Sequence, residues 1–263
     1  MRRLPTVGVM CTLILGWSVV GDKSLLLAAN RDESPLRPSE RPRVLRHGPR
    51  LVGGRDLWAG GTWLALRAGR CAVGVLNRRP PVDLSAGPGA GPVPSPKPPS
   101  RGLLALAVAA AGDGSPAGAA AAALLLLAAD SYAPCSLVVA GPAAAFVVNH
   151  RAPGETSVET LAPGWHVITH EDVDDSREPR TAWLAGELRD FRPHSEDDGL
   201  ARLGELLARH DGDGPAVCLH EGRMVTVSTI RVAMSAEATR YFHGEGPACS
   251  ASLIDCSHLL EDS

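Results

Sequence analysis

The order of strand-like and helix-like segments is the feature that most constrains the fold of this chain of 263 residues. Apolar runs broken by Gly and Pro turns fill residues 11–77 and again 135–170, and the last strands are expected at 215–220 and 224–232. Ala- and Leu-rich or capped amphipathic segments predict helices at 101–111, 117–130, 177–190 and 197–210. Two antiparallel sheets packed face to face, with helices outside both, fit this order. We therefore expect an α+β fold, a four-layer αββα sandwich.

Charge and hydropathy exclude two classes of partner. The net charge is only −3, and no run of Lys and Arg alternates with aromatic residues, so we expect no nucleic-acid partner. The longest apolar run, 117–129, is shorter than the about 20 residues of a membrane helix. We therefore expect no integral membrane segment and a cytoplasmic location.

The cysteine and histidine patterns do not indicate a metal site. The six cysteines are scattered and include no Cys-x-x-Cys pair, which leaves Cys249 and Cys256 as the one plausible disulfide. The nine histidines include no His-Glu-x-x-His motif. An acidic run at 171–175 lies just before an expected helix, where carboxylates are ordinary caps. We expect no bound metal.

The first two strand-like runs place a thiol near polar groups. Residues 11–20 and 24–30 flank a Gly-Asp turn, which predicts a tight hairpin. A turn centred there would set Cys11 opposite Asp32 and would put Cys11, Asn30 and Asp32 on one face. A slip of one residue would undo this arrangement.

Met10 precedes Cys11, which allows a specific chemistry. If translation starts at Met10 and this Met is removed, Cys11 carries a free α-amine that can act as base for its own thiol. Residues 1–9 would then be an extension that is not translated or is removed, and 10–263 would form one domain with a Pro-rich insert at 80–100. The amine and a nearby Arg31 would favour the thiolate. The alternative is that Cys11 is a small buried residue at a strand start.

Two later residues end strands that could reach the same region. Asn77 closes an alternating strand, where its amide could donate to a developing oxyanion or could cap the turn into the Pro-rich segment. His170 ends the expected strand 165–170 and could reach the same mouth as Cys11.

Several separated motifs occur together over residues 10–77. They are Met10-Cys11-Thr12-Leu13, Asn30-Arg31-Asp32-Glu33, Pro38-Ser39, Gly54-Arg55-Asp56, Ala59-Gly60-Gly61-Thr62-Trp63-Leu64 and Asn77. In this order they resemble the transport and Golgi organisation protein 2 family, also called the NRDE family. The resemblance implies an N-terminal-nucleophile hydrolase-like αββα sandwich.

The resemblance also implies a set of site residues. It maps the nucleophile onto Cys11, an amine-orienting pair onto Arg31 and Asp32, and an oxyanion donor onto Asn77, with Asn30, Trp63 and His170 expected at the substrate. His170 stands where related cysteine hydrolases have a second Asn. A late Arg of many relatives falls on Val227, with Arg231 nearby.

Two functions follow from this resemblance. The first is an N-terminal-cysteine amidohydrolase that acts on a small amide or acyl-amide and requires no cofactor. The alternative is a non-catalytic protein that binds or traffics haem or a lipid in the same cleft.

Overall fold

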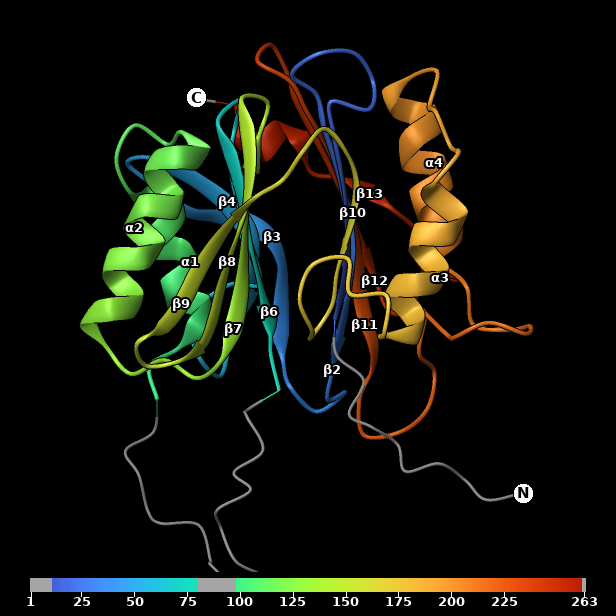
Figure 1. Cartoon of the computed structure of the whole chain (residues 1–263), viewed down its shortest axis with the longest axis horizontal. Coiled ribbons are helices and arrows are strands. Elements are labelled where there is room, and N and C mark those ends of the chain that lie inside the picture. Colours follow the sequence, from blue (N-terminus) through green and yellow to red (C-terminus); the bar gives the residue numbers. More distant parts are fainter. Residues whose placement is uncertain (1–10, 80–97, 262–263) are drawn as a thin grey trace, which may run out of the picture.

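Two antiparallel sheets packed face to face form the centre of the molecule (Figure 1). The computed structural model describes residues 11–79 and 98–261. Within these ranges one sheet has the strand order β10 (Gly164–Ile168), β1 (Thr12–Trp17), β2 (Leu25–Glu33), β11 (Val225–Met234), β12 (Thr239–Glu245) and β13 (Ile254–Asp255). The other has the order β3 (Ser39–His47), β4 (Arg50–Asp56), β5 (Leu64–Arg67), β6 (Cys71–Asn77), β7 (Cys135–Gly141), β8 (Ala144–Ala152) and β9 (Glu155–Thr160).

Helices cover the outer face of each sheet. α1 (Arg101–Ala110) and α2 (Pro116–Ala129) pack on the seven-stranded sheet, whereas α3 (Pro179–Leu188) and α4 (Glu196–Leu207) pack on the six-stranded sheet (Figure 1). Side-chain oxygens of Ser100, Ser115, Glu178 and Ser195 accept backbone N–H groups and so begin the four helices. A short 3₁₀ helix, η1 (Ser257–Leu260), follows β13. The expected α+β sandwich of four layers, αββα, is confirmed.

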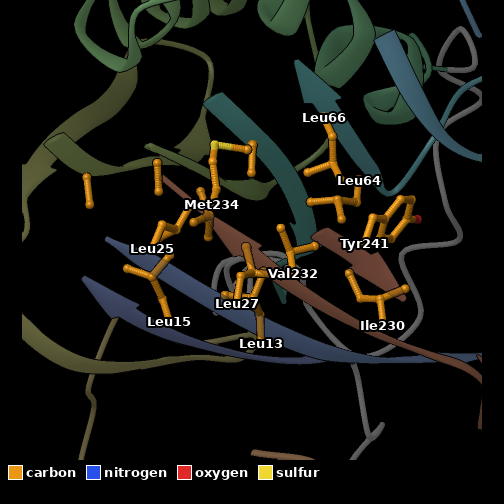
Figure 2. Packing of buried hydrophobic residues seen from close by; sticks show 14 of the residues in the cluster. Leu13, Leu15, Leu25, Leu27, Leu64, Leu66, Ile230, Val232, Met234 and Tyr241 are labelled. Atoms are coloured by element: carbon orange, nitrogen blue, oxygen red, sulfur yellow. The ribbon is translucent and has the colours of Figure 1, made fainter. Parts of the chain in front are cut away.

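The central strands are apolar on both faces because the other sheet covers one side and helices cover the other, whereas the edge strands β3 and β9 are largely exposed. In β1 and β2, Leu13, Leu15 and Leu27 point into the space between the sheets, where they meet Leu64 and Leu66 of β5 (Figure 2). The alternating residues of the same strands, among them Ile14, Leu26 and Ala28, pack against α3 and α4. The period of two thus sorts each strand into a sheet–sheet face and a sheet–helix face.

The register of the β1–β2 hairpin differs by one position from the expected one. Thr12 lies opposite Asn30, so the register continues to Cys11 opposite Arg31 rather than Asp32. The reason is the turn: a loop from Ser18 to Ser24, closed by a hydrogen bond from Ser18 N to Ser24 O of 2.7 Å, replaces the expected two-residue turn. The predicted common face for Cys11, Asn30 and Asp32 is therefore wrong, since Cys11 falls on the sheet–sheet side with Arg31.

Three local expectations also change. Residues 215–220 form no strand; instead the backbone N–H groups of Val217 and Cys218 bind the carbonyl of Arg209 at the end of α4. β3 lies within the expected irregular excursion 34–50, and β12 lies in the expected loop-rich tail. β3 is largely exposed and rich in Arg, so it lacks the apolar alternation that would have revealed it.

Cys249 and Cys256 do not pair in the structure. Both are free thiols, and Cys249 instead lies 3.9 Å, Sγ to Sγ, from Cys218. The Sγ of Cys256 donates to the carbonyl of Ile254 at 3.7 Å. The one disulfide that the sequence left open, Cys249–Cys256, is not formed in the structure.

Within the described ranges, no helix combines the length and hydropathy needed to cross a membrane. Residues 1–9 and most of the expected Pro-rich insert 80–100 fall outside the described residues. Residues 98–100 are described, and Ser100 caps α1.

Close backbone packing at Gly53 yields a stability prediction. A Cβ at this position in β4 would overlap the backbone oxygen of Leu64 in the neighbouring β5. We expect Gly53→Ala to lower the free energy of unfolding by about 1–3 kcal/mol, measured by urea denaturation. The matched control is Gly186→Ala, at an exposed position of α3 where a Cβ meets no atom within 4 Å. This substitution should raise the free energy of unfolding by up to about 1 kcal/mol. Equal effects of the two substitutions would contradict this packing.

Candidate functional site

A cleft of about 620 Å³ opens where β1 and β5 begin and where β2, β4 and β6 end. Most of the expected site residues line this cleft: Cys11, Arg31, Asp32, Trp63 and Asn77. Arg37, Asp56, Trp58 and Arg101 complete much of its wall. Asn30 and His170, discussed below, have other surroundings.

The Cys11 thiol is half-buried at the cleft, and its Sγ donates to the backbone carbonyl of Asp32 at 3.6 Å. Burial raises the pKa of Cys11 to about 11; the negative charge of Asp32 adds to this effect, whereas Arg31 opposes it. Cys71 and Cys135, which lie deep in the core, also have a pKa raised to about 11 by burial. With residues attached ahead of Cys11, the expected preference for thiolate is therefore not met.

Arg31 shares the sheet–sheet side with Cys11. Its guanidinium lies 4.5 Å from the centroid of the Trp63 ring, which favours a cation–π contact. It also donates to Ser39 Oγ at 3.4 Å and lies 3.8 Å from a Glu33 oxygen. Trp63 and Glu33 contact the Arg31 guanidinium on two sides, so its positive charge is held next to the thiol.

The Asp32 carboxylate points the other way, into the layer between the sheet and the helices. It accepts from Thr226 Oγ1 at 2.7 Å and from Arg180 Nη1 at 3.4 Å. Arg180, in the first turn of α3, also donates to Thr12 Oγ1 at 2.6 Å. Burial raises the pKa of Asp32 to about 6, although Arg180 and Thr226 favour its ionised form.

Sequence reasoning assigned no role to Arg180 or Thr226. The Pro-Arg pair at 179–180 signals a helix start, but nothing local indicates that this Arg reaches Asp32. Arg231 is the nearby alternative for the Arg that many relatives have late in the chain. It lies on β11 opposite Ala28 of β2, and its guanidinium occupies the space that a Cβ on Gly204 of α4 would need. It therefore faces the helices, while Arg180 supplies the buried cation beside Asp32.

Asn30 is an anchor for the protein rather than an open binding group. Its side-chain amide is fully buried and donates to the carbonyls of Leu207 and Val217 at 2.9 and 3.1 Å. It thereby ties β2 to the end of α4 and to the segment that follows. Both amide hydrogens are therefore used within the protein, whereas Oδ1 has no hydrogen-bond partner among the described residues, and the expected contact of Asn30 with substrate stays a prediction.

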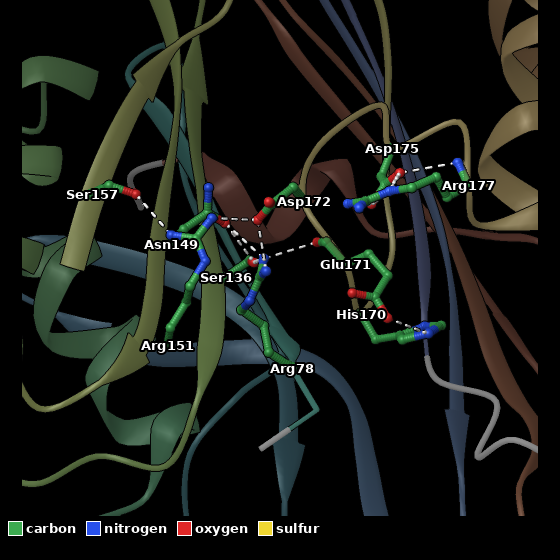
Figure 3. A network of polar contacts seen from close by, with 10 residues as sticks. All are labelled: Arg78, Ser136, Asn149, Arg151, Ser157, His170, Glu171, Asp172, Asp175 and Arg177. Atoms are coloured by element: carbon green, nitrogen blue, oxygen red, sulfur yellow. Dashed lines mark hydrogen bonds and ion pairs between the residues drawn. The ribbon is translucent and has the colours of Figure 1, made fainter. Parts of the chain in front are cut away.

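Asn77 is the last residue of β6 and is exposed at the cleft. The next residue, Arg78, is buried and donates to Ser136 Oγ and Asn149 Oδ1, each at 3.0 Å, and to Asp172 Oδ1 at 2.6 Å (Figure 3). These contacts fix the end of β6 against β7, β8 and the loop after β10. The position of Asn77 is therefore set by its neighbour.

His170 lies in the loop after β10. Extending the β1–β10 register, in which Leu13 faces Ile168, brings His170 opposite Cys11. The imidazole is buried, and its Nε2 lies 3.3 Å from Glu171 Oε1 (Figure 3). Burial, with help from the charge of Arg79, lowers the pKa of His170, so the ring is neutral at neutral pH.

Comparison with known proteins agrees with this architecture. The family model for Transport and Golgi organisation 2 matches residues 10–225. The Caenorhabditis elegans ortholog of N-acylethanolamine-hydrolyzing acid amidase superposes with a TM-score of 0.57 at 15% identity, covering 86% of this chain and 93% of its own. A Cys-to-Ala variant of the conjugated bile acid hydrolase of Clostridium perfringens gives a TM-score of 0.52 at 13% identity, with coverages of 97% and 95%. No curated protein matches by sequence. Both structural neighbours have the N-terminal-nucleophile hydrolase fold.

The burial of Asp32 leads to a prediction about how this carboxyl group titrates and how stability depends on pH. Its carboxyl group should titrate near pH 6 in a ¹³C NMR titration, above its ordinary value of 3.8. Because the folded-state pKa lies above that of the unfolded chain, this group's contribution to stability is fully present below about pH 4 and is lost as the pH rises through about 6.

The control for this titration is Asp32→Asn. The difference in unfolding free energy between wild type and this variant should change between about pH 4 and 6 and should level off above this range. A carboxyl that titrates at or below its ordinary value would contradict the buried environment of Asp32.

Proposed function

The chain belongs to the Transport and Golgi organisation 2 family and has the N-terminal-nucleophile hydrolase fold, and from this premise we propose that it is an N-terminal-cysteine amidohydrolase. Its substrate would be a small amide or acyl-amide. The observation that carries the proposal is the position of the Cys11 thiol, at the start of β1, in one cleft with Arg31, Trp63 and Asn77. Among the described residues that line this cleft, no other side chain is a comparable nucleophile.

The thiol needs a base that the described residues do not provide by contact. In the described part of the chain its hydrogen-bond partner is a backbone carbonyl, which is too weak a base to take the proton. An α-amine on Cys11 would titrate near 7.7–8, so a substantial fraction is unprotonated at neutral pH, and because it belongs to the same residue it can accept the thiol proton as Sγ attacks. The proposal therefore requires Cys11 to be the first residue of the active protein, as removal of Met10 would make it.

The reaction divides into acylation and deacylation. The α-amine takes the thiol proton, Sγ attacks the amide carbon, and the oxygen becomes an oxyanion that the Asn77 amide would stabilise. The tetrahedral intermediate collapses with cleavage of the C–N bond, and the α-ammonium gives its proton to the leaving amine. Water, deprotonated by the same amine, then hydrolyses the thioester to release the acid and regenerate the thiol.

The surrounding charges suit these steps. Arg31, held against Trp63, places a positive charge beside the developing thiolate. Asp32 presents its carbonyl to the thiol, and its carboxylate is fixed below by Thr226 and Arg180. An ionised Asp32 would in turn stabilise the α-ammonium that forms during acylation. Arg180 acts through Asp32, so it is a positioning residue.

The cleft supports an acyl-amide as the substrate class. Trp58, Trp63 and Val75 give it apolar walls that suit an acyl chain, and its volume lies within the usual range for small-molecule sites. The two structural neighbours are an ortholog of N-acylethanolamine-hydrolyzing acid amidase and a conjugated bile acid hydrolase. We therefore place an N-acyl amide first among the substrates to test.

The test uses a chain that begins at Cys11 and a panel of N-acyl amides. Turnover should fall at least about 10³-fold in Cys11→Ala, since the nucleophile is lost. Asn77→Ala should lower kcat by about 10²–10³ with little change in KM, as expected for a donor used in the transition state. Cys256→Ala, which removes a thiol outside the cleft, is the matched control and should retain activity.

The alternative function, binding of haem or a lipid without catalysis, predicts the opposite result. The panel would then give no turnover with authentic Cys11-terminated protein. Haem titration would show saturable binding that depends on Cys11 or on the neutral imidazole of His170. That combination would refute the amidohydrolase.

A further inference from the structure

Two thiols and two imidazoles meet outside the cleft, on three segments that are distant in sequence. His210 follows α4, Cys218 and His220 lie in the segment before β11, and Cys249 lies between β12 and β13. The Cys249 Sγ is 3.3 Å from His220 Nε2, and the Cys218 Sγ is 3.9 Å from both. A nitrogen of His210 lies within 4.8 Å of the ligand atoms of His220 and Cys249.

The three separations among Cys218, His220 and Cys249 match edges of a tetrahedral zinc site. With Zn–S near 2.3 Å and Zn–N near 2.0–2.1 Å, tetrahedral geometry gives S···S edges of about 3.8 Å and S···N edges of about 3.5 Å. The Cys218–Cys249 separation is 3.9 Å, and the two S···N separations to His220 are 3.3 and 3.9 Å. The sulfurs are too far apart for a disulfide, whose S–S bond is about 2.05 Å.

His210 is the fourth proposed ligand, and a hydrogen bond of its imidazole indicates which ring nitrogen could bind the metal. His210 Nδ1 lies 3.0 Å from the carbonyl of Ala208, so it donates there and leaves Nε2 as the ligand atom. Asp211 also lies 3.0 Å from this Nε2, but its side chain is 88% exposed and free to turn away. The rings of His210 and His220 are 4.7 Å apart, centroid to centroid.

We propose that His210, Cys218, His220 and Cys249 bind one zinc ion. Two thiolates and two imidazoles are a ligand set typical of structural zinc, and four protein ligands leave no open position, so the site is structural. The expectation of no metal rested on sequence spacing. Spacing could not reveal this set, because Cys249 lies 29 residues beyond His220 and joins it only in the fold.

The ion would stabilise the hydrogen bonds that hold the Asp32 carboxylate in place. Leu219, between the two central ligands, donates its backbone N–H to Thr226 Oγ1 at 2.9 Å, and its carbonyl accepts from Thr226 N at 2.9 Å. Thr226 in turn donates to Asp32. Zinc at Cys218 and His220 would fix this chain of hydrogen bonds. The zinc site itself stands whether or not the protein is an amidohydrolase.

The test is zinc binding by the purified full-length chain under reducing conditions. Elemental analysis should give about one zinc per chain, and Co²⁺ in its place should show thiolate-to-metal charge-transfer absorption. Cys249→Ser and His220→Ala should each weaken zinc binding by more than about 10-fold and should remove or alter the Co²⁺ spectrum. Cys249 is exposed, so its substitution should leave the fold intact, which circular dichroism checks.

The matched controls are His194→Ala, an exposed histidine elsewhere, and Cys256→Ser. Both should bind zinc as tightly as wild type. The proposal is overturned if the wild-type chain binds no zinc, if Cys249→Ser binds it equally well, or if the controls lose it to the same extent.

Discussion

The pairing of β1 with β2 is the constraint on which the candidate site depends. With Thr12 opposite Asn30, Cys11 and Arg31 fall on the sheet–sheet side, where Trp63 of the other sheet meets them. The same pairing turns the Asp32 carboxylate toward Arg180 and Thr226. A slip by one residue would exchange these surroundings and bury the thiol among the helices. One hairpin therefore places the Cys11 thiol and the Asp32–Arg180 ion pair on opposite faces of the sheet.

Burial raises the pKa on both sides of the β1–β2 hairpin, but the consequences differ. On the cleft side it raises the pKa of Cys11 and so keeps the thiol protonated and weakly reactive. On the helix side it raises the pKa of Asp32, but Arg180 and Thr226 compensate part of this effect. Breaking such a buried pair by removing one partner is usually costly, because the remaining charge is left without compensation. The thiol, by contrast, gains a base only if the backbone amine of Cys11 is free.

Much of the fold could be predicted from the sequence, whereas the details of the site could not. Periodicity and caps located the four helices, and apolar runs located most strands, because the central strands are buried on both faces. The β1–β2 register failed because a loop of seven residues, with positive φ at Ser18 and Lys23, replaces a two-residue turn. Arg180 and Thr226 were missed because they reach Asp32 from 148 and 194 residues away. Contacts at that separation leave no local pattern.

The central claim is that Cys11 becomes a nucleophile only as the first residue. The most direct test is the thiol pKa of Cys11, obtained from the pH dependence of its alkylation followed by peptide mass spectrometry. Two proteins are compared, one that begins at Cys11 and one that retains residues 1–10. The account predicts a pKa near 11 in the longer protein and a value lower by at least about one unit in the shorter one. Equal pKa values in the two proteins would contradict it.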